Sequence, residues 1–163
     1  MSQTFSGTLH PIDLSDPQHA NAVLSLLDEY ARDPMGDGAP LPDYVKQNLI
    51  PRLSHIDTFR GLLAEIEGKF VGMAVCYLGF STFKAKPLIN IHDLCVSPSA
   101  RGQGVGTALL EGVDNLARQY GCACVTLEVR ADNRARNLYL RHGFDPGDPK
   151  TDAMSFWKKP IDG

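Results

Sequence analysis

The chain has 163 residues, of which 43% are hydrophobic and 21% are charged, and its formal net charge is −3 at pH 7. This length suits one folded domain, so we predict a single domain over residues 1–163. A net acidic chain does not favour general nucleic-acid binding, and no apolar run approaches the roughly 20 residues that cross a bilayer. The first ten residues lack the basic and apolar regions of a secretory signal, which predicts a cytoplasmic protein.

The cysteines are candidates for metal binding or disulfide formation. Three of the four lie in hydrophobic, strand-like stretches, and their spacing matches neither CxxC nor a Cys/His ligand pattern. We interpret them as small buried apolar residues in a reducing compartment, and we predict no metal site. The four are Cys76, Cys95, Cys122 and Cys124.

The first part of the chain predicts a strand, two helices and a run of strands. Asp16-Pro17 can cap a helix whose apolar residues follow at helical spacing. A following segment with three prolines and two glycines is expected to be a loop. The predicted elements are a strand over 5–12, a helix from Asp16, a loop over 33–42, a helix over 43–53, strands over 61–66 and 70–80, a loop over 79–87 and a strand over 88–96.

The second part continues the mixed pattern. Apolar residues from Val105 to Tyr120 recur with a period of 3.6, and Gly121 stands where a helix-ending residue belongs. The predicted elements here are a helix over 105–120, a strand over 123–129, a helix over 134–142 and a last strand over 154–159. This order indicates one mixed α/β domain.

The strand that ends at Val96 changes its apolar face in the middle. Ile89 and Ile91 share one parity, whereas Leu94 and Val96 share the other. A regular half-buried strand cannot change faces, so we predict a β-bulge near His92-Asp93. The alternative is a strand buried on both faces, in which parity carries little meaning. A bulge would separate the strand from its neighbour and leave backbone amides free for a ligand.

A glycine-rich segment, Arg101-Gly102-Gln103-Gly104-Val105-Gly106-Thr107, lies between this strand and the amphipathic helix. Alternating glycines let the backbone approach an anion, and the helix N-terminus adds unpaired N–H groups. We predict a pyrophosphate site, with a flexible turn as the alternative. The segment is not a P-loop, because no Gly-Lys follows. It is not GxGxxG either, because Thr107 and Leu109 stand where glycine is required.

The spacing R-x-x-G-x-G in this segment resembles the acetyl-CoA signature of the GNAT N-acetyltransferase superfamily. The stretch 127–144 is similar to that family's next motif, in which an Asn after a strand end precedes L-Y-x-x-x-G-F. The resemblance implies an α/β (α+β) fold of the acyl-CoA N-acyltransferase type. In that fold a mixed, mostly antiparallel central sheet, with a splayed fourth and fifth strand pair, is flanked by helices.

The resemblance also implies acetyl-CoA as the co-substrate, with the pantetheine arm paired to the splayed fourth strand. In the family the Asn usually stands seven residues before the Tyr; that position is Asp132 here, and Asn133 stands six before. We therefore expect Asn133 to contact the coenzyme, although it stands one residue later than the family's Asn. The expected coenzyme contacts are Leu94, Cys95, Val96, Arg101, Gly102, Gln103, Gly104, Val105, Gly106, Thr107, Asn133 and Asn137.

The mechanism implied by the resemblance is attack of an amine on the thioester, which needs a proton acceptor and a donor for the departing sulfur. Tyr139 matches the family's general acid; a core tyrosine is the alternative. His92 is the first candidate for the base, since an imidazole can titrate near neutral pH. Asp93 is the second, because some polyamine acetyltransferases carry Glu-Asp at what look like the His92-Asp93 positions.

The acceptor is expected to be a small polycation, such as a polyamine or an aminoglycoside. Acidic residues crowd the first helix and the loop after it, and they would attract such a molecule. They are Asp28, Glu29, Asp33, Asp37 and Asp43. The alternatives are a protein lysine or N-terminal amine, an amino acid, or a non-catalytic acetyl-CoA-binding sensor. We expect no nucleic-acid or membrane partner, and a homodimer is one expected arrangement because many relatives of the resembled family are dimers.

Overall fold

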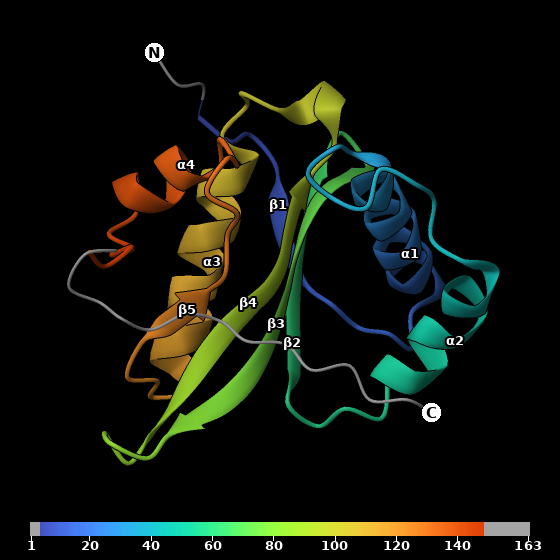
Figure 1. Ribbon diagram of the computed structural model, residues 1–163. Helices are drawn as coiled ribbons and strands as arrows, with labels where there is room; N and C mark the ends of the chain where they lie inside the picture. Colours follow the sequence, from blue (N-terminus) through green and yellow to red (C-terminus); the bar gives the residue numbers. More distant parts are fainter. Residues whose placement is uncertain (1–3, 149–163) are drawn as a thin grey trace.

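A computed structural model describes residues 4–148 of the chain. The described residues form a central sheet with α1 and α2 on one side and α3 and α4 on the other (Figure 1). In chain order the elements are β1 (Thr8–Pro11), α1 (Pro17–Arg32), α2 (Asp43–Leu53), β2 (Phe59–Ile66), β3 (Lys69–Ser81), β4 (Lys86–Val96), a 3-10 turn (Pro98–Ala100), α3 (Val105–Gln119), β5 (Val125–Leu127) and α4 (Arg136–Arg141). The predicted mixed fold is confirmed.

The five described strands lie in the order β1-β2-β3-β4-β5. The pairs β1–β2, β2–β3 and β3–β4 are antiparallel, whereas β4 and β5 are parallel. This parallel pairing covers only three residue pairs, from Ile89↔Val125 to Ile91↔Leu127. The sheet is therefore mostly antiparallel, as predicted, and its one parallel junction is short.

Several predicted boundaries are wrong. The loop predicted over 79–87 is only a short turn, because β3 continues to Ser81 and β4 begins at Lys86. The strands predicted over 5–12 and 123–129 are shorter, covering Thr8–Pro11 and Val125–Leu127. The strand predicted over 154–159 lies outside the described residues.

Each face of the sheet carries its own apolar cluster. On the α3 face, Leu109 and Val113 are fully buried against the sheet residues Ala74 and Ile89. On the α1 face, the buried residues include Val23, Leu26, Leu63, Met73 and Cys95. Side chains of a strand point alternately to the two faces, so one strand contributes to both clusters. The sheet is thus packed on both sides.

The helix α3 lies unusually close to β3. A side chain at Gly72 would bring a Cβ within 2.8 Å of the Val105 Cγ1 atom and 3.1 Å of the Cys95 carbonyl oxygen. Glycine at this position lets the first turn of α3 contact the sheet directly. The N-terminus of α3 is therefore held beside the end of β4.

The first helix begins with a well-formed cap. Asp16 accepts a hydrogen bond from the Gln18 N–H at 2.8 Å, and Pro17 occupies the first helical position. At the other end, the Asp33 N–H donates to the Tyr30 carbonyl. These contacts define the two ends of α1, which packs against β3 and β4. Among residues 4–148, no helix has the length and apolar character that a membrane span requires.

We expect Leu109→Ala to destabilise the fold strongly. Leu109 is fully buried between α3 and the sheet, so its truncation leaves a cavity and costs about 2–5 kcal/mol. Leu140→Ala is the matched control, because that side chain is 50% exposed and its truncation should cost under about 1 kcal/mol. Urea unfolding of both variants measures the difference. Equal losses would contradict the assignment of Leu109 to the core.

Candidate active site

The predicted bulge in β4 is confirmed. Val75 of β3 pairs with Asp93, but the next residue, Cys76, pairs with Ile91, so His92 is the extra residue. Ile91 packs on the α3 face before the bulge, and Leu94 packs on that same face after it. One inserted residue therefore explains the change of parity in the sequence.

The bulge marks the point where β4 and β5 separate. Their pairing ends at Ile91↔Leu127, one residue before His92. Beyond this point, residues 94–96 of β4 and 128–130 after β5 lie on the walls of a cavity of about 640 Å³. The gap leaves the edge of β4 open toward this cavity, as the resemblance implied for the pantetheine arm.

Segments from three other parts of the chain also line the cavity. These walls are Tyr30 of α1 with residues 33–35 after it, Arg101 of the glycine segment with Gly106 of α3, and residues 132–135 with Leu138 and Tyr139 from the α4 region. The sequence predicts that β4, the glycine segment and Tyr139 lie at one site, and the structure brings them together. It also adds Tyr30, Pro34 and Met35, which were not predicted.

The glycine segment forms a tight turn that leads into α3. Gly102 and Gly104 have positive φ angles of 79° and 78°, and Gly104 is the N-terminal cap of the helix. Residues in this left-handed conformation turn successive backbone N–H groups toward one point and create an anion-binding concavity. The first N–H groups of α3 have no partner within the helix. This geometry fits a pyrophosphate group.

Not all residues of the segment face the cavity with their side chains. Val105 is buried in the core, so only its backbone is available to a ligand. Gln103 donates from Nε2 to the Ser99 carbonyl at 3.1 Å, which holds the turn together. A Cβ at Gly106 would lie 2.9 Å from the Leu138 Cδ2 atom, so glycine here permits α4 to approach α3. Thr107 belongs to the first turn of α3.

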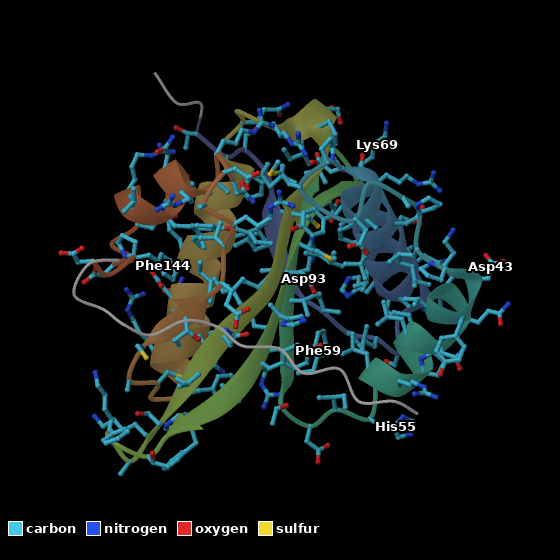
Figure 2. The ribbon with its side chains drawn as sticks, viewed as in Figure 1. Asp43, His55, Phe59, Lys69, Asp93 and Phe144 are labelled. Atoms are coloured by element: carbon cyan, nitrogen blue, oxygen red, sulfur yellow. The ribbon has the colours of Figure 1, made fainter. Side chains whose placement is uncertain are left out.

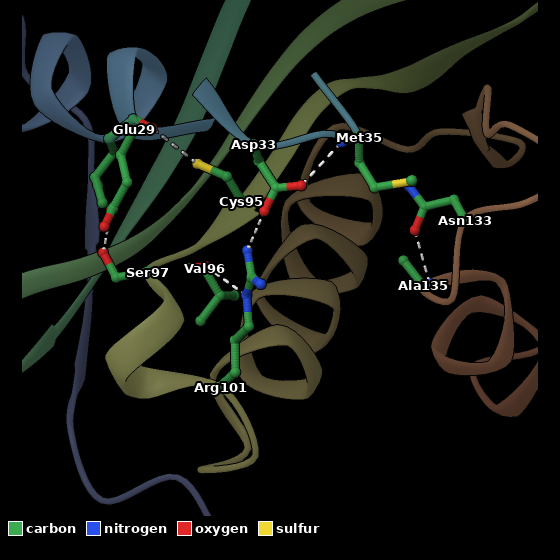
Figure 3. A network of polar contacts seen from close by, with 10 residues as sticks. Glu29, Asp33, Met35, Cys95, Val96, Ser97, Arg101, Asn133 and Ala135 are labelled. Carbon is green, nitrogen blue, oxygen red and sulfur yellow. Dashed lines mark hydrogen bonds and ion pairs between the residues drawn. The ribbon is translucent and has the colours of Figure 1, made fainter. Parts of the chain in front are cut away.

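Arg101 connects the glycine segment to the loop after α1. Its guanidinium lies 2.9 Å from an Asp33 carboxylate oxygen, and its Nε donates to the Val96 carbonyl at 3.3 Å (Figure 3). Hydrogen bonding from the Met35 N–H and from Arg101 lowers the pKa of Asp33. The loop that begins at Asp33 is thereby fastened to the wall of the cavity.

His92 is the bulge residue itself, whereas Asp93 follows it and pairs with Val75 of β3. The His92 side chain is exposed, lines the cavity and contacts the Tyr77 ring edge-on, with 5.6 Å between the ring centroids. Asp93 lies near the middle of the sheet and is not among the residues that line the cavity (Figure 2). Burial raises the pKa of the Asp93 carboxyl, and the nearby His92 opposes this shift. His92 is the more accessible of the two candidate bases.

Tyr139 projects from α4 into the cavity. Its ring packs edge-on against Phe144 at 5.8 Å, and burial together with the nearby Tyr30 raises its pKa to about 12. A phenol with this pKa remains protonated at neutral pH, as a proton donor must. Tyr30, from the last turn of α1, lies near enough to Tyr139 to contribute to this raised pKa. The sequence suggested only that Tyr30 belongs to the apolar stripe of its helix.

The two predicted asparagines differ in position. Asn133 lines the cavity, and its side-chain oxygen accepts a hydrogen bond from the Ala135 N–H at 2.8 Å (Figure 3). It therefore supports the turn before α4, while Asp132, at the family's usual position, forms a salt bridge with Arg130. Asn137 is exposed and is not among the residues that line the cavity. The structure does not bring Asn137 to the site.

The acidic surface predicted for the acceptor is smaller than the sequence indicated. Asp28 forms a salt bridge with Arg32 and also accepts a hydrogen bond from the Leu41 N–H. Glu29 accepts a hydrogen bond from the Ser97 hydroxyl at 2.6 Å (Figure 3). Asp33 is paired with Arg101, as described above. Three of the five acidic side chains are therefore engaged by neighbouring groups.

The cysteine prediction is correct in part. Cys76 and Cys95 are buried, Cys122 is half-buried, and Cys124 is exposed, so the interpretation of all four as buried residues is wrong for Cys124. All four are free thiols. Within residues 4–148, no group of three or more histidine, cysteine or acidic side chains is arranged to hold a metal ion.

We expect Gly104→Glu to weaken acetyl-CoA binding by roughly 100-fold or more, because a carboxylate would stand where the pyrophosphate is expected. Gly68→Glu is the matched control, since Gly68 also has a positive φ, 76°, but lies in the distant β2–β3 turn. Calorimetric titration with coenzyme A measures the affinity of each variant. An unchanged affinity in Gly104→Glu would overturn the assignment of this turn.

Comparison with known proteins gives relatives that match part of the chain. An uncharacterized N-acetyltransferase of Bacillus subtilis is 39% identical over 85 residues, which are 52% of this chain and 57% of that protein. An aminoalkylphosphonate N-acetyltransferase of Salmonella typhimurium is 35% identical over 50% of this chain and 54% of its own length. A thialysine N-epsilon-acetyltransferase of Bos taurus is 37% identical over 45% and 43%. The chain thus spans about half the length of these curated relatives.

Solved structures resemble the fold over nearly the whole chain. A probable acetyltransferase has a TM-score of 0.77 at 21% identity and covers 96% of this chain and 99% of its own. An aminoglycoside acetyltransferase from an uncultured soil metagenomic sample, in complex with sisomicin, has a TM-score of 0.73 at 18% identity, covering 95% and 97%. At these identities the likeness shows the fold alone.

The family model described as the acetyltransferase (GNAT) family matches residues 23–144. This range runs from α1 through β4, the glycine turn and α4, so it contains the separated strands and the walls of the cavity. The chain belongs to the GNAT acetyltransferase family.

Proposed function

We propose that this protein is an N-acetyltransferase that transfers the acetyl group of acetyl-CoA to a primary amine by direct attack. The observation that carries the proposal is the gap between β4 and β5, which opens beside an anion-binding turn and has Tyr139 in its wall. The open edge of β4 suits a pantetheine chain, the turn suits a pyrophosphate group, and Tyr139 can give a proton to the departing sulfur.

The coenzyme is expected to bind mainly through the backbone. The open edge of β4 at residues 94–96 would pair with the amides of the pantetheine arm, and the turn at residues 101–107 would hold the pyrophosphate. Arg101 supplies a charged side chain within this turn, although Asp33 already contacts it. Asn133 retains its side-chain N–H₂ group for the coenzyme because only its oxygen is used in the turn.

The reaction needs one group to take a proton and another to give one. The amine nitrogen forms a bond to the carbonyl carbon, the carbon–sulfur bond breaks, and the thiolate leaves. We assign Tyr139 as the donor to sulfur, because burial and Tyr30 raise its pKa and keep it protonated. His92 faces the cavity and is our first candidate for the acceptor of the amine proton; Asp93 is the second.

For the acceptor, we propose a small molecule that carries a primary amine. Relatives named for aminoalkylphosphonate and thialysine acetylation support this class. A small polycation such as a polyamine or aminoglycoside remains our first choice within it, although several acidic residues of α1 are already paired. A protein amine and a non-catalytic coenzyme sensor are the alternatives, and the cytoplasmic location and homodimer stay predictions from sequence.

We expect thiol release from acetyl-CoA in the presence of a small primary amine. The test panel contains polyamines, aminoglycosides, aminoalkylphosphonates, amino acids and lysine peptides, and the readout is free thiol together with the acetylated product by mass spectrometry. Acetylation of lysine peptides alone would contradict the small-molecule proposal. Tight coenzyme binding without turnover on any amine would instead favour a sensor.

We expect His92→Gln to lower kcat/KM for the acceptor by about 10²-fold, with recovery at high pH where more of the amine is already neutral. Asp93→Asn distinguishes the second candidate. Burial raises the Asp93 pKa, so the carboxyl becomes protonated and inactive as pH falls through that raised value. If Asp93 is the base, the rate of Asp93→Asn no longer falls at acidic pH, whereas the rate of His92→Gln still does.

The matched control for both variants is Asp57→Asn, because Asp57 is an exposed residue just before β2 and does not line the cavity. It should leave the pH–rate profile unchanged. A profile of His92→Gln identical to that of the parent would exclude His92 as the base.

A further inference from the structure

We propose that Tyr30 is a second catalytic tyrosine, whose hydroxyl donates a hydrogen bond to the carbonyl oxygen of the thioester. This inference rests on the proposed acetyl transfer. In that reaction the carbonyl oxygen gains negative charge when the amine attacks, and it needs a hydrogen-bond donor at that moment. Tyr139 was assigned above to the sulfur atom, so the oxygen still lacks a side-chain donor.

Tyr30 lies at the wall of the cavity. It lies in the last turn of α1, where Leu26 and Ala31 are buried, and its carbonyl accepts the Asp33 N–H that ends the helix. The side chain is half-buried and lines the same cavity as Tyr139. The helices that carry the two tyrosines, α1 and α4, lie on opposite faces of the sheet (Figure 1), and both side chains line the cavity where β4 and β5 separate.

Both hydroxyl groups are available for a ligand. Among residues 4–148, neither the Tyr30 hydroxyl nor the Tyr139 hydroxyl takes part in a hydrogen bond. Burial raises the pKa of both phenols, so both are protonated donors at neutral pH. Neither hydroxyl is fully buried, so water can bond to each one until a ligand replaces it. The cavity therefore offers two hydroxyl donors for two acceptor atoms of a ligand.

The packing of the two tyrosines separates their hydroxyl groups. Tyr30 packs against the α1-face cluster that contains Cys95, whereas Tyr139 packs against the α3-face cluster, so the two side chains reach the cavity from opposite faces of the sheet. Tyr139 matches the family's donor to sulfur, which leaves Tyr30 for the other atom of the thioester that gains charge. The carbonyl oxygen belongs to Tyr30 and the sulfur to Tyr139.

The experiment compares two unreactive coenzyme analogues by calorimetry. In S-acetonyl-CoA a ketone carbonyl stands close to the position of the thioester carbonyl, whereas S-ethyl-CoA has no carbonyl group. We expect Tyr30→Phe to weaken binding of S-acetonyl-CoA by about 10-fold, which is the loss of one hydrogen bond of about 1.4 kcal/mol. Its affinity for S-ethyl-CoA should remain that of the parent protein. Turnover of acetyl-CoA should fall by about 10²-fold.

Two tyrosine variants serve as matched controls. Tyr44→Phe removes the same atom from an exposed residue of α2, and it should change neither affinity nor rate. Tyr139→Phe should lower the rate while keeping the parent's ratio of affinities for the two analogues. Thermal unfolding of all three variants confirms that each one is folded.

A spectroscopic measurement on the parent protein avoids any dependence on a variant's folding. The carbonyl stretch of bound ¹³C-labelled S-acetonyl-CoA should shift to lower wavenumber than in water-free solvent, and the shift should vanish in Tyr30→Phe. Equal loss of affinity for both analogues, or an unchanged ratio and an unchanged carbonyl stretch, would overturn the assignment. Failure of the parent to bind either analogue would instead refute the proposed function itself.

Discussion

One extra residue in β4 controls the arrangement of the site. His92 has no partner in the register of β3 and β4, so the side chains that follow it exchange faces. The same strand then leaves β5, with which it shares only three residue pairs. Without the bulge, Leu94 and Val96 would face α1, and β4 would continue alongside β5. The open strand edge and the position of Asp93 follow from this local change in backbone geometry, and the open edge forms one wall of the cavity.

Much of this arrangement could be predicted from sequence, because it depends on local patterns. The switch of parity between Ile91 and Leu94 favoured a bulge, and the glycines before Val105 favoured a turn into a helix. The residues matched to the family motifs then placed Tyr139 near both. Short-range rules of backbone geometry and side-chain alternation determine these features, so a single chain contains enough information to locate them.

The remaining features depend on contacts between distant segments. Tyr30 looked like an ordinary member of the apolar stripe of α1, since nothing within its own helix distinguishes it from a core residue. The acidic residues of α1 looked free, but Ser97 and Arg101 bind Glu29 and Asp33 across 68 positions of sequence. The loop predicted over 79–87 was wrong because pairing between β3 and β4 overrides the weak strand preference of Gly79 and Pro87.

The two apolar clusters on opposite faces of the sheet share no buried residue. Substitutions among the buried residues of α1 therefore repack one layer, while α3 keeps its packing against the other face of the sheet. The cavity is lined from both layers, by Tyr30 of α1 and by Tyr139 of α4, so a change of packing in either layer can alter the site.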